Sequence, residues 1–302
     1  MTNTTAEKRP DMELTTLSPR RKATDNVVRG AVTVAVALAI LPLGWLIYTL
    51  IARGIGPLLD IDWWTRSERY GGAANAIVGT LMQTAIAAVV AIPLGVLVAI
   101  YLVEYADTGA KRGRRFSLVR VTTFMVDVLS GVPSIVAALF VYAVWRTTLD
   151  MPRSGFAVAL ALVLLMVPLV VRATEEMLKI VPQELREASY ALGVPKWKTI
   201  LRIVLPTAMS GIITGIMLAI ARVMGESAPV LILVGASRAM NYNPFDGNQE
   251  SLPLMMLQEY NKGPGGYETV WGAALTLVIA VAIVYVLARI LSRFTGPRME
   301  RS

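Results

Sequence analysis

The sequence predicts an all-α integral membrane protein with six transmembrane helices. Of its 302 residues, 55% are hydrophobic and only 17% are charged, and the mean hydropathy is +0.58. These values exceed those of ordinary soluble domains. A helix needs roughly 20 consecutive apolar residues to cross the hydrocarbon core, and six runs of about that length occur. They lie near Val27–Ile51, Ala76–Tyr101, Val119–Trp145, Gly155–Val171, Ala208–Val234 and Val270–Leu291.

The predicted membrane domain covers residues 27–295, between a polar tail of residues 1–26 and a short tail of residues 296–302. The first tail carries five Lys and Arg residues but lacks the apolar stretch of a cleaved signal. We therefore expect this tail to be solvated and the first span to remain in the mature protein.

The distribution of basic residues predicts that both termini are cytoplasmic, because positively charged loops resist translocation. With the N terminus inside, 20 of the 29 Lys and Arg residues fall on the inner side and seven on the outer side. Arg172 and Arg222 fall within or near the bilayer. Topology and anionic lipid at the inner leaflet thus explain most of the net charge of +8, without nucleic acid.

The connection at about residues 236–269 faces outward in this topology and is too long for a tight turn. Its apolar piece Leu252–Leu257 is too short to span, which predicts a short interfacial or gate helix. The pair Met255 and Met256 fits simple packing as well as gating.

Arg222 is the first candidate for a substrate pathway, since a charge inside a span costs at least about 2.5 kcal/mol to insert. Glu226 follows one helical turn later on the same face. The segment Gly225–Pro229 predicts a helix break that frees backbone N–H groups toward a polar cavity. A guanidinium forks onto an oxyanion, which favours substrate passage over a plain ion pair between helices.

Arg172, at the inner end of the fourth span, is followed by Glu175 at i+3 and Glu176 at i+4. This spacing puts all three side chains on one helical face. Long side chains snorkel to the interface at such a position, so a structural and a functional role both stay open.

Asp127 lies roughly two turns inside the third span, before the flexible break Gly131–Ser134. A lone buried carboxylate must be paired or neutral. Either Arg222 or Arg172 would serve as its partner, which makes Asp127 a gate residue of the candidate pathway or a structural tie.

The composition excludes several classes of function. Without His or Cys, the chain cannot hold an imidazole or thiolate metal site, form a disulfide, or run Ser-His or Cys-His catalysis. A P-loop requires Gly followed by Lys, and no Gly here is followed by Lys. We therefore expect no enzymatic activity and no cofactor or nucleotide bound by this chain.

A polar loop at about residues 182–206 holds Glu187-Ala188-Ser189, then Gly193, then Ile203-Val204-Leu205-Pro206. A helix that inserts into a groove needs small residues, a Gly to turn out of the helix, and a Pro to restart the chain. The spacing resembles the EAA loop of ABC-importer permeases, a short cytoplasmic helix that docks on a separate ATPase. Only Ser189 departs from that pattern, where Ala is usual.

Further segments between about residues 75 and 290 are similar to the phosphate-specific permease subunits of bacterial ABC importers. The most specific are Gly131-Val132-Pro133-Ser134-Ile135-Val136 and Gly225-Glu226-Ser227-Ala228-Pro229. The resemblance implies a type I importer permease fold in the bacterial inner membrane. It also implies four kinds of partner: a homologous second permease, a cytoplasmic ABC ATPase dimer, an extracytoplasmic phosphate-binding protein, and membrane lipid.

The resemblance also implies residue roles. An intramembrane Arg after an Ala, and an Arg-x-x-Glu at the inner end of the fourth span, are associated with phosphate passage in that family. These features fall on Arg222, Arg172 and Glu175, while Glu226 and Glu175 would moderate the attraction so that the anion can leave. The residues implied for contact with the ATPase are Glu187, Ala188, Ser189 and Gly193.

Alternatives stay open at this point. The substrate could be another oxyanion, such as phosphonate or sulfate, and the chain could be the paralogous second phosphate permease. A secondary transporter or channel that works alone is disfavoured by the EAA loop. An intramembrane enzyme is disfavoured by the missing His, Cys and nucleotide motif.

Overall fold

The computed structural model describes residues 19–105 and 118–295, and its regular elements there are all helical. A bilayer core offers no water, so a spanning segment must satisfy its backbone internally, as a helix does. Five helical stretches are long and apolar enough to cross a membrane, and a bent pair of helices supplies a sixth candidate span. The predicted all-α membrane fold is confirmed. The long helices are α1 (Pro19–Leu59), α3 (Ala74–Glu104), α7 (Gly155–Ile180), α10 (Leu205–Met224) and α13 (Tyr267–Thr295).

The chain divides after Thr49 into two compact units. The first unit holds most of α1, whose apolar side chains are largely exposed, as suits a helix solvated by lipid. The helix begins at Pro19, so residues 19–26, expected in the polar tail, are helical. Residues 1–18 and 296–302, which make up the rest of the predicted tails, lie outside the described residues.

Helix α7 is the centre of the second unit and packs against α3, α5, α6, α10 and α11. Small residues let membrane helices approach closely. A Cβ built on Gly95 of α3 would lie 2.7 Å from Val170 Cγ1, and one built on Gly215 of α10 would lie 2.4 Å from Ala173 Cβ. These two close approaches place α3 and α10 directly against α7, at Val170 and Ala173.

The third apolar run does not form one straight span. It consists of α5 (Leu118–Ser130) and α6 (Ser134–Tyr142), which continues as a π-helical turn, Ala143–Thr148, and the two parts meet at 104°. Pro133 disfavours helical geometry in the residue before it and cannot donate a backbone hydrogen bond. The sequence predicted this break but not its angle.

The fifth span begins earlier and ends earlier than the predicted Ala208–Val234. Its helix starts at Lys196 and ends at Met224. Pro206 therefore lies within a continuous helix and does not restart the chain, because a π-helical turn directly before it accommodates the missing N–H. The short elements here are α9 (Lys196–Thr199), the π-helical turn Ile200–Val204, and α11 (Ala228–Leu233).

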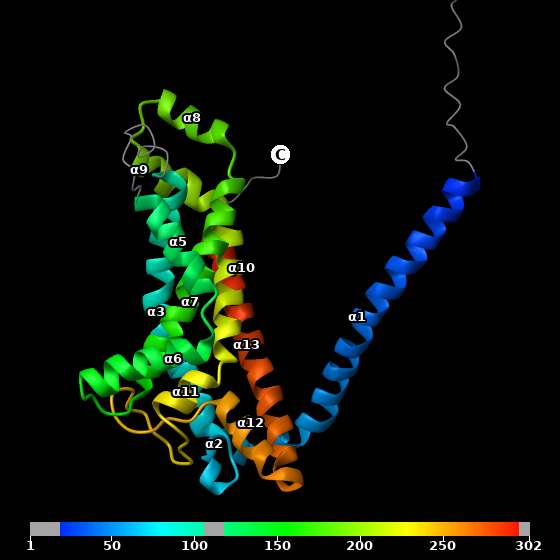
Figure 1. Ribbon diagram of the computed structural model, residues 1–302, viewed down its shortest axis with the longest axis vertical. Helices are drawn as coiled ribbons and strands as arrows, with labels where there is room; N and C mark the ends of the chain where they lie inside the picture. The colour runs from blue at the N-terminus through cyan, green and yellow to red at the C-terminus, as the bar shows by residue number, and fades with distance from the viewer. Residues whose placement is uncertain (1–18, 106–117, 296–302) are drawn as a thin grey trace, which may run out of the picture. The chain divides into compact units, whose positions relative to one another are not determined.

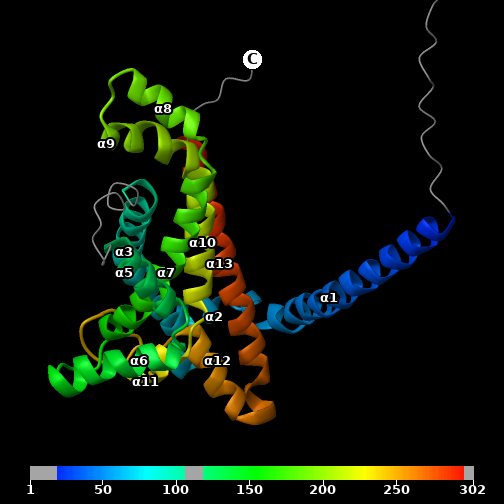
Figure 2. The same cartoon turned by 45° about the horizontal axis from the view of Figure 1, so that its top comes forward.

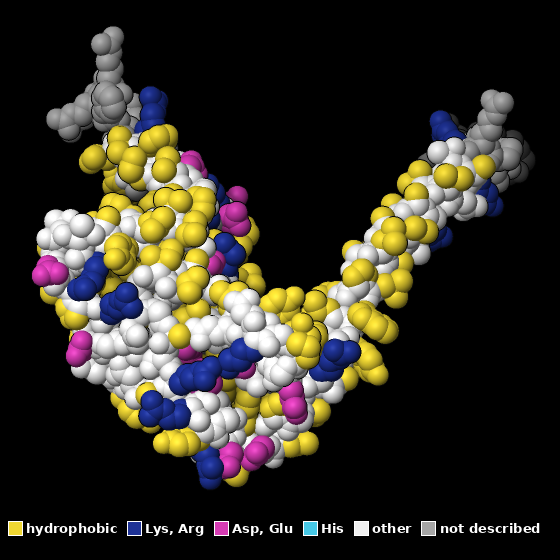
Figure 3. Space-filling model, turned by 60° about the horizontal axis from the view of Figure 1, so that its bottom comes forward, with side chains coloured by type: hydrophobic (Ala, Val, Ile, Leu, Met, Phe, Trp, Pro, Cys, Tyr) yellow, Lys and Arg dark blue, Asp and Glu magenta, His cyan; other side chains and the backbone are white. Residues whose placement is uncertain are grey.

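Figures 1 and 2 show α3, α7, α10 and α13 running side by side. Helices α8 (Gln183–Ala191) and α9 lie at one end of this bundle, and α2 (Ile61–Thr65) and α12 (Leu252–Asn261) lie at the other. Figure 3 brings the α12 end forward and shows Lys, Arg, Asp and Glu side chains across it. Two 3₁₀ turns, Glu68–Tyr70 and Gly263–Gly266, complete that end.

Helix α12 is the short helix expected in the outward connection. Met255 is fully buried, in a small apolar cluster with Trp63, Leu252 and Ala273, and Met256 packs partly buried against it. Met255 and Met256 therefore act as packing residues in this conformation.

Candidate functional site

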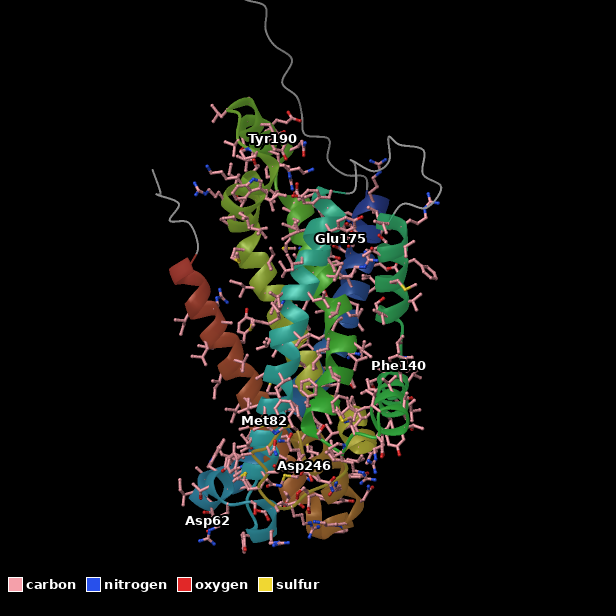
Figure 4. All side chains as sticks on the ribbon, turned by 90° about the vertical axis from the view of Figure 1, so that its left-hand side faces the viewer. Asp62, Met82, Phe140, Glu175, Tyr190 and Asp246 are labelled. Carbon is pink, nitrogen blue, oxygen red and sulfur yellow. The ribbon has the colours of Figure 1, made fainter. Side chains whose placement is uncertain are left out.

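A line of alternating charges follows the C-terminal half of α7. Arg172 Nη1 donates to Glu175 Oε2 at 2.7 Å, and Lys179 Nζ donates to Glu175 Oε1, also at 2.7 Å. Glu175 is nearly buried, with 12% of its side chain exposed, so both cations hold it in place. Glu176, on the next position, is exposed. Figure 4 shows Glu175 toward the same end of the bundle as Tyr190 of α8.

Asp127 of α5 pairs with Arg172 Nη2. The partner of this carboxylate is therefore Arg172 and not Arg222. Asp127 is not deeply buried as the sequence predicted, because 57% of its side chain is exposed. The pair lies three residues before α5 ends at Ser130 and ties α5 to α7 beside the 104° bend.

Arg222 and Glu226 form the predicted pair at i, i+4, with 3.6 Å between Nη2 and Oε1. The Arg222 side chain is 64% exposed, and it occupies the last turn of α10, where the helix dipole favours a cation. Helix α10 ends at Met224, and Gly225 is its C-cap. Since Gly215 packs against Ala173, Arg222 lies about 10 Å further along α10 than that level. The two arginines therefore occupy separate levels.

The EAA segment forms a short helical hairpin. Helix α8 closes with Gly193 at φ +76°, a conformation that other residues rarely adopt. Glu187 and Ala188 are exposed on α8. Ser189 is buried, and its Oγ lies 2.8 Å from Thr199 Oγ1, so it joins the two arms of the hairpin.

Arg186 is a buried residue that the sequence did not single out. Its Nη2 donates to Glu104 Oε1 at 2.9 Å, and its Nη1 donates to the Val181 carbonyl at 2.6 Å. Two features of the sequence could have pointed to this pair: Glu104 ends an apolar run, and Arg186 directly precedes Glu187 of the EAA segment. Their separation of 82 residues concealed the pairing.

A second group that sequence reasoning missed lies in the connection before α12. Glu250 is 1% exposed and accepts hydrogen bonds from the backbone N–H groups of Ser237 at 3.0 Å and Ser251 at 3.2 Å. Burial raises the pKa of Glu250 to about 7. Burial also raises the pKa of Glu68, whose Oε1 lies 3.0 Å from Arg238 Nε.

These carboxylates do not form a metal centre. Among residues 19–105 and 118–295, no group of three His, Cys, Asp or Glu side chains is arranged to hold a metal ion.

Comparison with known proteins identifies the class. The profile of the family described as binding-protein-dependent transport system inner membrane component matches residues 91–301, and the chain belongs to this family of ABC importer permeases. It is 53% identical over 293 residues to the phosphate transport system permease protein PstA 1 of Mycobacterium tuberculosis strain H37Rv, covering 94% of this chain and 92% of that protein. It is also 53% identical over 274 residues to PstA of Mycobacterium leprae, covering 88% of each chain.

Solved structures confirm the type I importer permease fold. The chain superposes on the crystal structure of a bacterial ABC transporter involved in the import of the acidic polysaccharide alginate with a TM-score of 0.63 at 12% identity. The match covers 93% of this chain and 99% of that one. The resemblance to phosphate permeases noted in the sequence is confirmed, and the chain is a multi-pass protein of the inner membrane.

Proposed function

We propose that this permease carries inorganic phosphate into the cell. The observation that carries the proposal is the placement of Arg172 and Arg222 at two levels along α7 and α10, each beside carboxylates. The 53% identity to curated PstA proteins supports phosphate as the substrate and favours this subunit over its paralogue.

Arg222 would receive the anion at the outer level. Phosphate near neutral pH is a mono- or dianion, and a guanidinium offsets part of its desolvation cost. The Arg222 side chain is largely exposed, and its contact with Glu226 at 3.6 Å is longer than a normal hydrogen bond. Its fork of N–H donors is therefore available to a phosphate oxygen.

Arg172 would receive the anion at the inner level. Glu175 holds one side of the guanidinium, while the exposed Asp127 occupies the other. A phosphate oxygen would replace Asp127, and Asp127 would return when the anion leaves. Such an exchange keeps binding weak enough for passage, which a set of uncompensated cations would not allow.

Energy would come from a cytoplasmic ABC ATPase dimer docked on α8, where Glu187 and Ala188 are exposed and Gly193 shapes the turn. ATP and Mg would bind to that partner, and this chain needs no cofactor of its own.

A homologous second permease would complete the path. An extracytoplasmic phosphate-binding protein would dock on the end opposite α8, where Figure 4 places Asp62 and Asp246. The excess of Lys and Arg in the loops expected on the inner side supports cytoplasmic termini.

The test is uptake of labelled phosphate at micromolar concentration in cells lacking the chain, before and after its restoration. Uptake that is restored, and that only unlabelled phosphate competes away, is the expected result. Competition by sulfate or phosphonate would transfer the assignment to those oxyanions.

Arg222→Gln tests the path itself. Removing the Arg222 cation should abolish uptake, because the anion then meets Glu226 without compensation. The ATPase should copurify with the variant as with the wild type, since Arg222 lies at the far end of α10 from α8. Normal uptake in Arg222→Gln would show that this residue is dispensable.

A further inference from the structure

Arg186 joins three helices through one buried side chain. Only 9% of its side chain and 4% of the Glu104 side chain are exposed. Its Nε and Nη2 both donate to Glu104 Oε1, at 3.1 and 2.9 Å, which attaches α8 to the last residue of α3. Its remaining donors cap the end of α7 at the carbonyls of Leu178, 2.9 Å, and Val181, 2.6 Å. A buried ion pair keeps a fixed geometry when its other protons are satisfied in this way.

Helix α9 is attached to the same end of α3. Lys196 Nζ donates to the Glu104 carbonyl and lies 4.9 Å from the centre of the Tyr105 ring. The hydroxyl pair of Ser189 and Thr199 joins α9 back to α8. Both arms of the hairpin are thus held against α3 by polar contacts.

Apolar packing contributes little to this attachment, although Ile200 directly after α9 is buried. The main hydrophobic cluster includes Leu178, Val181 and Val204, but none of the described residues 182–203 belongs to it. A cavity of about 560 Å³, lined in part by Glu104, Arg186 and Tyr190, opens beside the ion pair. The position of α8 relative to α3 and α7 therefore depends on the polar ties.

We propose that the Arg186–Glu104 pair is the rigid link through which α8 moves the inner ends of α3 and α7. The inference rests on the proposed function, in which α8 docks on the ATPase. A movement of α8 reaches the pathway because α7 carries Arg172 and Glu175 six and three residues before Leu178, whose carbonyl Arg186 caps. Packed helices pass on such a displacement as rigid bodies. Arg186 and Glu104 are thus positioning residues for coupling.

Glu104→Gln tests the link while preserving side-chain size. The matched control is Glu184→Gln, an exposed carboxylate on α8 that lines the same cavity. In the purified complex reconstituted in vesicles, Glu104→Gln should lower phosphate uptake per ATP hydrolysed roughly tenfold, within the usual range of coupling between sites. The control should not. The amount of copurified ATPase should be unchanged in both variants.

A distance measurement tests the Arg186–Glu104 link independently of the substrate that the permease carries. The chain has no Cys, so Leu97→Cys on α3 and Leu192→Cys after α8, 64% and 83% exposed, give two unique labelling sites. Electron spin resonance should find a narrow distribution of distances between the labels, and Glu104→Gln should broaden it while Glu184→Gln leaves it narrow.

Three results are decisive. An unchanged label distribution in Glu104→Gln overturns the link, and so does loss of the copurified ATPase, which would make the pair an assembly contact. If the wild type takes up no phosphate but the distribution still broadens in Glu104→Gln, the link stands and the proposed substrate fails.

Discussion

Glu250 should make the stability of the α12 end of this permease depend on pH. The pKa of this carboxyl is about 7 in the folded chain, against an ordinary value of 4.5, because burial disfavours the charged form. Between these two values the folded state binds more protons than the unfolded state. The stabilisation is therefore complete below about pH 4.5 and is lost as the pH rises through about 7.

The size of the effect follows from the pKa difference. At 1.36 kcal/mol for each pKa unit, raising the pH from about 4.5 to above 7 should cost about 3 kcal/mol of stability. Glu250→Gln stays neutral across this range and keeps one of the two acceptors that face Ser237 and Ser251. The variant should match the wild type near pH 5 and exceed it by about 2 to 3 kcal/mol at pH 8.

The assay is thermal unfolding of the purified chain in detergent between pH 5 and 8, followed by the fluorescence of its six tryptophans. Asp246→Asn is the matched control, since it removes an exposed carboxylate from the same connection. Some pH dependence should remain in Glu250→Gln, because burial also raises the pKa of Glu68. A variant that keeps the full wild-type dependence, or that is less stable than the wild type at pH 8, would refute the reasoning.

Two further substitutions test packing and the EAA hairpin. Gly95→Ala should destabilise the chain by about 1 to 3 kcal/mol relative to Gly44→Ala, because its Cβ would lie 2.7 Å from Val170 Cγ1 while nothing lies within 4 Å of Gly44. Equal unfolding midpoints for the two variants in detergent would contradict the close approach of α3 and α7. Ser189→Ala should cost about 1 kcal/mol through the lost contact with Thr199 but leave phosphate uptake unchanged, as measured in complemented cells. Reduced uptake would assign Ser189 a role in coupling.

The length of the apolar runs was enough to predict the spans, because lipid requires one helical run for each crossing. Their ends were harder to predict. The helix of the fifth span continues through Pro206 because a π-helical turn absorbs the missing donor, and a local pattern does not reveal that turn. The break at Pro133 was visible in the sequence, but its angle of 104° depends on how α6 packs against α7 and α11.

The candidate site likewise contains ion pairs that spacing along one helix predicts and an ion pair that only tertiary packing produces. The pairs Arg172–Glu175 and Arg222–Glu226 lie one turn apart on single helices, so spacing alone predicted them. Asp127 and Arg172 are 45 residues apart, and periodicity could only offer two partners for the carboxylate. A pairing over such a distance is a property of tertiary packing.

The balance of charge along α7 sets what the pathway can do in the proposed function. Arg172 and Lys179 are matched by Glu175 and Asp127, so the inner level is close to neutral before an anion arrives. An anion that reaches Arg172 gains a hydrogen-bonding fork by displacing one carboxylate, and it must yield that place again to leave. In the proposed function, the exposed Asp127 would let the anion leave again, whereas the buried Glu175 would keep Arg172 oriented during the exchange. In this proposal the two carboxylates around the Arg172 guanidinium have different roles, release for Asp127 and orientation for Glu175, because Asp127 is exposed and Glu175 is nearly buried.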